Sequence, residues 1–433
     1  MMILERVVKQ QNRQDVVLQA PEHFSHDAVA ERYAKMFDLL DWRQVPERDE
    51  SLAQCGRLPH PEAAYVKAYL VMTEEKKTSQ KDVRRYLLEH PALVWEIGFR
   101  LVADEQSVYG FDVGRSVPSE RHLRRKLGEL DSQNLTELLG QTVQHALDIM
   151  PDLGETISLD IKHIYANVKE NNPREEVADR YDPKRQLRGD PDARLGVKRK
   201  HNQGDASHDP ASKTEYIWGY GTGVSVAQTP DKDAIVLGDF TQPFNANDVT
   251  YAESLLAQAE QRLGFASLNL AADAAFDAIH LYQGPAERGG IAAIALNLRG
   301  NPPFYLGPND YPLCGCNAQE MLPRSQWLEN GQRFQRFRCT DCGKVRKMNI
   351  ELGNLMRWRL DRQSPVYKAI YKQRTTTERI NSQAKALGIE RPQQRRIAPI
   401  ARRNTLIYIV INIRAIFRHH ERYINSDQPL KVA

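Results

Sequence analysis

Residues 156–165 read TISLDIKHIY, and this stretch decides the fold class. The apolar residues Ile157, Leu159 and Ile161 alternate with polar ones, which is the period-two pattern of a strand that buries one face. Asp160 falls on the opposite face. We therefore expect a β-strand here that presents a carboxylate on its polar side.

Four more strands are expected downstream, with helices between them. Apolar runs bounded by turn residues predict strands at 215–228, 234–242, 267–274 and 291–298, a helix at about 247–263 and a short helix before the last strand. In the strand at 267–274, Asp273 again lies opposite the apolar side chains. This order indicates an α/β fold with a mixed five-stranded sheet and flanking helices. The polar stretch from Asn171 to Lys213 is expected to be a mobile surface loop.

The first 150 residues have helical spacing and no long alternating stretch, which predicts an all-α N-terminal domain. Helices are expected to begin near Asp27, Pro61, Ser79, Pro91 and Ser119. The last of them carries three arginines suited to reading DNA in a helix-turn-helix arrangement: Arg121, Arg124 and Arg125. An ordinary helical bundle with a basic outer face fits the same pattern equally well.

The net charge of +4 is unevenly distributed along the chain. Residues 1–150 carry 20 basic and 24 acidic side chains, residues 151–310 carry 16 and 23, and residues 311–433 carry 24 and 9. A basic surplus confined to one segment favours a polyanionic partner, because such a surface attracts phosphates and releases their counterions. A solvated basic helix face without a partner is the alternative.

Length and composition exclude several classes of protein. A chain of 433 residues, 41% apolar and 27% charged, is typical of a globular protein of two or three domains. The longest apolar run, 406–411, is far shorter than the roughly 20 residues that a membrane span needs, and no signal peptide is recognisable. Five cysteines do not suit a disulfide framework. We expect a cytoplasmic, nucleoid-associated protein without a membrane partner.

Four of the five cysteines form two close pairs, Cys314 with Cys316 and Cys339 with Cys342, separated by 22 residues. Four thiolates so spaced can bind one Zn²⁺ tetrahedrally, and such a closed site is structural rather than catalytic. Reduced cysteines in a β-hairpin are the alternative. Cys55 stands alone and is interpreted as a packing residue.

A stripe of functional side chains is expected in the stretch YKQRTTTERINSQAK at 371–385. On one α-helix, four of its residues fall within a sector of roughly 60°: Tyr371, Arg374, Glu378 and Lys385. Ile380 and Leu387 point the other way, so the helix has an apolar back. A surface helix with an ordinary Arg–Glu pair four residues apart fits this pattern too.

Considered together, Asp160, Asp273 and Glu378 predict a divalent-metal site. Neighbouring parallel strands can bring the two aspartates together, and a late helix can lay the glutamate beside them. Carboxylates this close repel one another unless cations compensate, and two Mg²⁺ or Mn²⁺ ions suit phosphate chemistry. Asp239 is a competing acid, but its place in the strand order makes it the weaker candidate, with a loop-capping role.

The spacing Y-(2)-R-(3)-E-(6)-K of Tyr371, Arg374, Glu378 and Lys385 resembles the signature of a group of insertion-sequence transposases of the DDE class. LDIKHIYANVKENN resembles their first catalytic strand and LAADAAFDA the second, and the resemblance spans about residues 60–420. It implies a ribonuclease-H-like domain in which Asp160 binds two metal ions and Asp273 and Glu378 bind one each. It also implies that the remaining three residues of the signature contact the transposon end.

The resemblance divides the chain into four parts. These are a helical DNA-binding domain at 1–150, the first part of the catalytic domain at 151–299, a zinc-ribbon-like insertion at 300–350 and C-terminal catalytic helices at 351–433. The implied function is binding of terminal inverted repeats, metal-dependent DNA cleavage and strand transfer, by a homodimer on DNA. A domesticated metal-dependent nuclease and a DNA-binding regulator with the same fold are the alternatives.

Overall fold

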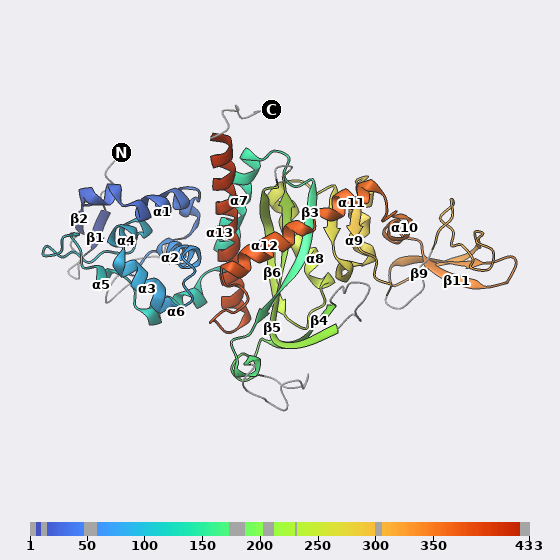
Figure 1. Ribbon diagram of the computed structural model, residues 1–433, viewed down its shortest axis with the longest axis horizontal. Coiled ribbons are helices and arrows are strands. Elements are labelled where there is room, and N and C mark those ends of the chain that lie inside the picture. Colours follow the sequence, from blue (N-terminus) through green and yellow to red (C-terminus); the bar gives the residue numbers. More distant parts are fainter. Residues whose placement is uncertain are drawn as a thin grey trace, which may run out of the picture.

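The computed structural model describes residues 6–9, 15–46, 59–172, 187–201, 212–229, 232–298 and 305–424 (Figure 1). Its helices are α1 (Ala28–Asp38), α2 (Glu62–Glu74), α3 (Gln80–Glu89), α4 (Pro91–Ile97), α5 (Val113–Ser116), α6 (Glu120–Glu129), α7 (Ser132–Ile149), α8 (Val249–Leu263), α9 (Ile279–Glu287), α10 (Leu352–Arg359), α11 (Pro365–Lys372), α12 (Thr375–Ala386) and α13 (Ile397–Ile424). Its strands are β1 (Arg6–Lys9), β2 (Asp15–Leu18), β3 (Thr156–Tyr165), β4 (Arg194–His201), β5 (Ser212–Gln228), β6 (Ala234–Pro243), β7 (Asn269–Ala272), β8 (Ala292–Ile294), β9 (Leu322–Glu329), β10 (Gln332–Arg338) and β11 (Val345–Asn349).

A mixed sheet forms the centre of the fold. β3 pairs antiparallel with β5 and parallel with β7, and β8 continues the parallel side. β5 is long enough to pair antiparallel with both β4 and β6. The sheet is thus mixed α/β as expected, but it has six strands rather than five. The extra strand, β4, lies where the sequence predicted a loop, because its pairing with the long β5 compensates for its polar composition.

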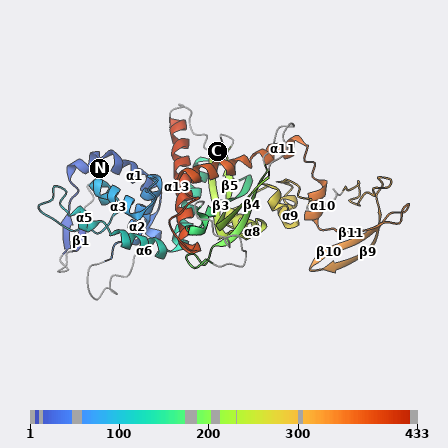
Figure 2. The same ribbon diagram turned by 60° about the horizontal axis from the view of Figure 1, so that its bottom comes forward.

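Helices cover both faces of this sheet. The apolar side chains of β3, including Ile157 and Leu159, pack with α7, α8 and α9. The other face, with Val224 and Val226 of β5, packs against α12 and α13. This second core is continuous with the buried side chains of α2, α3, α4 and α6, so α13 lies between the sheet and the N-terminal helices (Figures 1 and 2).

The long helix α13 is bonded to the edge strand β6 by several side chains, among them Asn412. Asn412 accepts a hydrogen bond from the Val236 N–H at 2.8 Å and donates to the Val236 carbonyl at 2.9 Å. Its amide thereby replaces a missing strand neighbour. A third bond, from Asn412 Nδ2 to the Thr142 hydroxyl oxygen of α7 at 2.8 Å, joins three elements in one buried network.

The predicted helix starts agree with the structure, and the predicted N-terminal fold class needs a correction. Asp27, Ser79 and Ser119 each accept a backbone hydrogen bond as N-caps of α1, α3 and α6. The N-terminal part is not all-α, however, because β1 and β2 form an antiparallel pair ahead of α1. Their four-residue strands are too short for a period-two pattern to stand out in the sequence. Cys55 lies outside the described residues. Across the described part of the chain, no helix has the length and apolar content that crossing a membrane would take.

Candidate active site

Asp160 of β3 and Asp273, the residue that follows β7, lie level with one another across two adjacent parallel strands. The register pairs Ser158 of β3 with Ala271 of β7. Two residues further along, the same offset brings Asp160 level with Asp273, which directly follows β7. Parallel register therefore brings together two side chains that are more than a hundred residues apart in the chain.

Helix α12 holds the Asp160 carboxylate from the other side. Asn381 donates from Nδ2 to Asp160 Oδ2 at 2.9 Å, and the Thr377 hydroxyl lies 3.5 Å from the same oxygen. The other oxygen, Oδ1, accepts from the Ile161 N–H at 2.9 Å. Because α12 also carries Glu378, this docking brings the third predicted carboxylate to the same site. Neither Asn381 nor Thr377 was expected from the sequence, since both look like ordinary polar helix residues.

The surroundings of Asp160 disfavour its charged form. Burial raises its pKa to about 6, and the negative charges of Asp273 and Glu378 act in the same direction. The Ile161 N–H and the Arg374 guanidinium oppose this change without cancelling it. The site thus gathers more negative charge than the described residues compensate, which is the electrostatic condition under which carboxylates bind a cation.

A fourth carboxylate, Asp248, belongs to the same group and was missed in the sequence. Burial raises its pKa to about 6, and Asp273 and Asp160 add to the increase. It occupies the N-cap position of α8, yet its side chain makes no capping hydrogen bond there. An aspartate before a helix is normally explained by capping. Only the tertiary structure separates Asp248 from such caps.

Glu378 forms an ion pair with Arg374 in this structure. Its Oε1 lies 2.8 Å from Arg374 Nη2, and the Glu378 side chain is 53% exposed against 25% for Arg374. This is the surface pair that the sequence offered as an alternative. The Arg374 guanidinium also lies 5.8 Å from the centre of the Tyr371 ring, which stacks on Tyr367 at 5.5 Å.

The signature residues do not share one helix, which corrects the sequence interpretation. Tyr371 belongs to α11, Glu378 and Lys385 belong to α12, and Arg374 lies at the junction as the N-cap of α12. Ile380 and Leu387 are buried as expected. The 64% exposed Lys385 lies 3.6 Å from Glu390, which also pairs with Lys162 of β3 at 2.5 Å.

The donor set fits a hard divalent cation by its chemistry. Carboxylate oxygens are the ligands that Mg²⁺ and Mn²⁺ prefer, and Asp160, Asp273, Asp248 and Glu378 supply only such oxygens. Nearby, Asn381 Oδ1 is buried without a hydrogen-bond partner among the described residues. No three carboxylates of the described chain have oxygens within 4.8 Å of one another, however. Binding of one ion by three of these carboxylates would therefore require their oxygens to move closer together.

Asp239 is not a loop cap, which corrects a second expectation. It lies within β6, where the register links it through Val224 to Asp160 in one row across the sheet. Burial raises its pKa to about 6, and the Thr405 hydroxyl of α13 donates to its Oδ2 at 2.9 Å. Asp239 therefore anchors α13 and lies two strands further from β7 than Asp160 does, because β5 and β6 follow β3 in the sheet.

The three N-terminal arginines are exposed on α6, which lies across α13 from the sheet (Figures 1 and 2). Arg124 pairs with Glu120 at 2.7 Å and Arg125 with Glu129 at 3.7 Å, both within α6. Arg121 is exposed as well. The structure therefore does not bring these residues to the carboxylates.

The four cysteines of the two pairs come together as the sequence predicted. All four sulfurs lie within 4.8 Å of one another, and no disulfide joins them. Three of the Sγ–Sγ distances are 3.3, 3.5 and 3.6 Å. Tetrahedral Zn–S bonds of about 2.3 Å place the sulfurs about 3.8 Å apart, so this cluster is close to a zinc geometry. Backbone N–H groups of Cys342 and Asp341 lower the pKa of Cys339, whereas hydrogen bonds to the neighbouring cysteines raise the pKa of Cys316.

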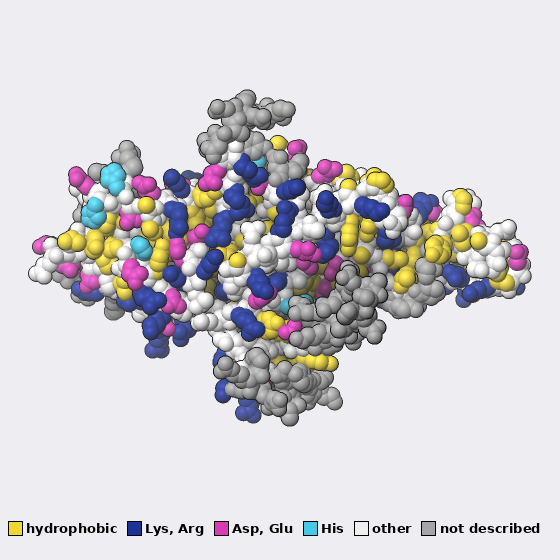
Figure 3. Space-filling view, viewed as in Figure 1, with side chains coloured by type: hydrophobic (Ala, Val, Ile, Leu, Met, Phe, Trp, Pro, Cys, Tyr) yellow, Lys and Arg dark blue, Asp and Glu magenta, His cyan; other side chains and the backbone are white. Residues whose placement is uncertain are grey.

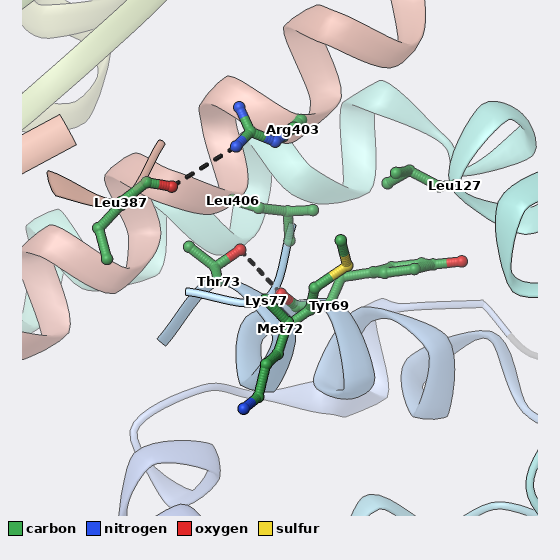
Figure 4. A pocket seen from close by; sticks show the side chains of 8 residues that line it. All are labelled: Tyr69, Met72, Thr73, Lys77, Leu127, Leu387, Arg403 and Leu406. Carbon is green, nitrogen blue, oxygen red and sulfur yellow. Dashed lines mark hydrogen bonds between the residues drawn. The ribbon is translucent and has the colours of Figure 1, made fainter. Parts of the chain in front are cut away.

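A small recess lies apart from both clusters, between α2, α6 and the start of α13 (Figure 4). Tyr69, Met72 and Leu406 line it. Arg403 at its wall donates to the carbonyls of Leu387 and Gly388 at the end of α12. No carboxylate, histidine or cysteine lines the recess.

No protein-family model matches the chain, and no curated protein matches its sequence. Among solved structures, the chain is similar to a piggyBac transposase in the cryo-EM structure of a synaptic complex with hairpin DNA. The two chains are 12% identical with a TM-score of 0.37, over 95% of this chain and 79% of the other. A superposition of this quality does not establish a shared fold.

Proposed function

We propose that the chain is a DDE-class DNA transposase that binds the terminal inverted repeats of its insertion sequence, cleaves DNA and transfers the freed strand. The observation that carries this proposal is the meeting of Asp160 and Asp273 on adjacent parallel strands, with α12 bonded to Asp160 and Glu378 close enough to raise its pKa. A structural role for these acids would call for partners that neutralise them, and Asp160 lacks such a partner among the described residues.

The strand order supports a ribonuclease-H-like catalytic domain. β6, β5 and β3 are antiparallel, β7 and β8 run parallel to β3, and the helices α8 and α9 connect β6 to β7 and β7 to β8. In this proposal the catalytic domain spans 151–299 and 351–433, and the segment 300–350 is an insertion between its last strand and the catalytic helix. Residues 1–150 form the N-terminal DNA-binding domain.

In this mechanism Asp160, Asp273 and Glu378 would hold two Mg²⁺ or Mn²⁺ ions, and Asp248 would be a further ligand or neighbour. When bound, such ions would supply activation of the attacking oxygen and stabilisation of the leaving one at the phosphodiester. Asn381 orients the Asp160 carboxylate. β3 and β7 fix the spacing of the two aspartates, since register cannot slip without exposing the buried faces of both strands.

DNA recognition near the site is proposed for Tyr371, Arg374 and Lys385. A phosphate that binds Arg374 replaces Glu378 as its partner and releases that carboxylate toward Asp160. Lys and Arg side chains also form a band down the middle of one face, over α12 and α13 (Figure 3). α13 alone carries five arginines and one acidic residue. Such a surface attracts the DNA backbone, and Arg121, Arg124 and Arg125 extend it on the proposed N-terminal domain.

The four-cysteine cluster is proposed to bind one structural Zn²⁺. The segment around it buries only a small apolar core, which includes Met321, Phe337 and Met348. A core of this size calls for a metal to hold the fold. Because all four ligands come from the protein, this ion has no open position for a substrate.

Incubation of the purified chain with Mn²⁺ and the DNA that flanks its gene tests the proposal. Cleavage at the ends of inverted repeats, followed by joining to a second DNA, supports it. Cleavage without end specificity or joining favours a domesticated nuclease, and tight end binding without cleavage favours a regulator. Joining two ends calls for two active sites, so we propose a homodimer on DNA.

A further inference from the structure

The three-stranded sheet β9–β11 has two unlike faces. It projects beyond α10, at the end of the molecule far from α1–α6 (Figures 1 and 2). One face packs Phe337 and Met348 against the cysteine cluster. The other face carries the side chains of three successive strands, and the proposed catalytic mechanism does not use it.

The outer face combines aromatic rings with cations. The register sets Trp327 of β9 opposite Phe334 of β10, and their rings stack with centres 6.0 Å apart and planes 21° apart. Lys347 of β11 lies 4.2 Å from the centre of the Phe334 ring and 5.4 Å from that of Trp327. Arg336 lies 5.3 Å from the Trp327 ring. Both rings are partly exposed, and both cations are exposed.

The charge of this segment is strongly positive. Residues 322–349 contain seven lysines and arginines and two acidic residues. One of these acids, Glu329, already holds two groups of the outer face: it pairs with Lys347 at 2.5 Å and accepts from Trp327 Nε1 at 3.0 Å. A surface cation–π ladder could serve only to cover the sheet, yet such cover does not require this surplus of charge.

We propose that this outer face, defined by Trp327, Phe334, Arg336 and Lys347, binds a DNA strand whose bases are unstacked. The rings offer flat faces on which bases stack, and the cations lie where a strand's phosphates would pass. A phosphate takes over Lys347 from Glu329 and draws it off the Phe334 ring, which opens that ring to a base. Intact duplex fits less well, because its bases are already stacked. The inference rests on the proposed function for the identity of its partner.

The test uses the full-length chain and a fluorescently labelled oligo-dT of about 20 nucleotides. The double variant W327A/F334A is expected to bind this strand at least about tenfold more weakly. R336Q/K347Q is expected to reduce the slope of log affinity against log salt concentration by about one to two. The conservative variant W327F keeps a ring and is expected to bind nearly as the unchanged chain does.

Leu328 provides the matched control. It is 72% exposed on the same strand and points to the other side of the sheet. L328A is expected to leave binding unchanged. The inference is overturned if W327A/F334A binds the strand as tightly as the unchanged chain does, or if L328A loses as much affinity as W327A/F334A. Tighter binding of an RNA strand of the same sequence would overturn it as well.

The outcome separates this inference from the proposed function. If the unchanged chain cleaves DNA while the ring variants bind the strand normally, the inference about the outer face is wrong and the transposase proposal stands. If the ring variants lose strand binding but no cleavage is found with Mn²⁺, the outer face stands and the transposase proposal fails.

Discussion

Asp273 and Asp277 are only four residues apart, but they belong to centres of opposite character. The Asp277 side chain is fully buried and pairs with Arg357 of α10 at 2.5 Å. It also accepts from the Tyr282 hydroxyl at 2.8 Å and the Asn297 N–H at 2.7 Å. Burial alone would raise its pKa, but these bonds lower it overall. Residues of the chain itself therefore neutralise the charge of Asp277, and their contacts join α9 to α10.

Among the described residues, the charges of the Asp160 centre are not neutralised in this way. Its neighbours include Asp273, Glu378 and Asp248, and the nearby Arg374 guanidinium is already bonded to Glu378. Burial and like charge raise the pKa of Asp160 to about 6. The contrast teaches that a buried carboxylate marks a functional site only when its charge is left for something outside the chain to neutralise.

The largest expected effect separates the two centres by activity. Asp160→Asn, Asp273→Asn and Glu378→Gln should each reduce DNA cleavage by about 10³-fold or more, because each removes a ligand of the metal ions. End binding should persist, as measured by gel shift. Normal cleavage by all three variants in Mg²⁺ would remove the carboxylates from the mechanism.

The second effect separates the centres by stability. Asp277→Asn should lower the free energy of unfolding by about 3–5 kcal/mol, since it leaves Arg357 buried without its anion. Asp160→Asn should not destabilise the metal-free chain, because it removes repulsion. Urea unfolding of both variants measures the difference. Equal destabilisation would mean that the two centres are alike.

A third prediction concerns the cysteine cluster, whose four sulfurs are also placed to bind a cation. The purified chain should contain about one zinc ion per molecule. Cys339→Ser should lower that zinc content, and amide exchange should speed up in β9–β11 before it does so in the central sheet. Metal analysis and amide hydrogen exchange report the two effects. A variant with full zinc content and unchanged exchange would show that the cluster is a set of packed thiols.

A fourth prediction follows from the raised pKa of Asp160. Its folded pKa of about 6 exceeds the usual 3.8, so the folded state holds the proton more tightly. The free energy of unfolding should therefore fall as pH rises from about 4 to 6, by up to about 3 kcal/mol at pH 7. Asp160→Asn should remove this component, and Mn²⁺ at pH 7 should restore stability to the unchanged chain. Identical pH profiles for the two proteins would contradict the assignment.

The smallest effects concern DNA contacts at the site. Arg374→Gln and Lys385→Gln should each weaken end binding and reduce the salt slope by about one, because each removes one phosphate contact. Salt slopes equal to that of the unchanged chain would place both residues off the DNA surface.

Much of the fold was readable from local pattern. Period-two alternation located β3 at the predicted residues, and the strands and helix around 215–263 agree closely with β5, β6 and α8. β4 was missed because its polar sequence has no strand pattern and its order comes from pairing with β5. The break between α11 and α12 was missed because helical spacing continues across Gln373 and Arg374, both of which keep helical backbone angles.

By itself, the sequence determined the alternation that makes β3, the two cysteine pairs and the Y-(2)-R-(3)-E-(6)-K spacing, since each depends on residues near in the chain. Only the tertiary structure decided that Asp248 joins Asp160 and Asp273, that Asn381 holds Asp160, and that Asp277 is neutralised while Asp160 is not. Charge compensation depends on which distant residues come within a few ångströms, and strand register and helix docking set those distances.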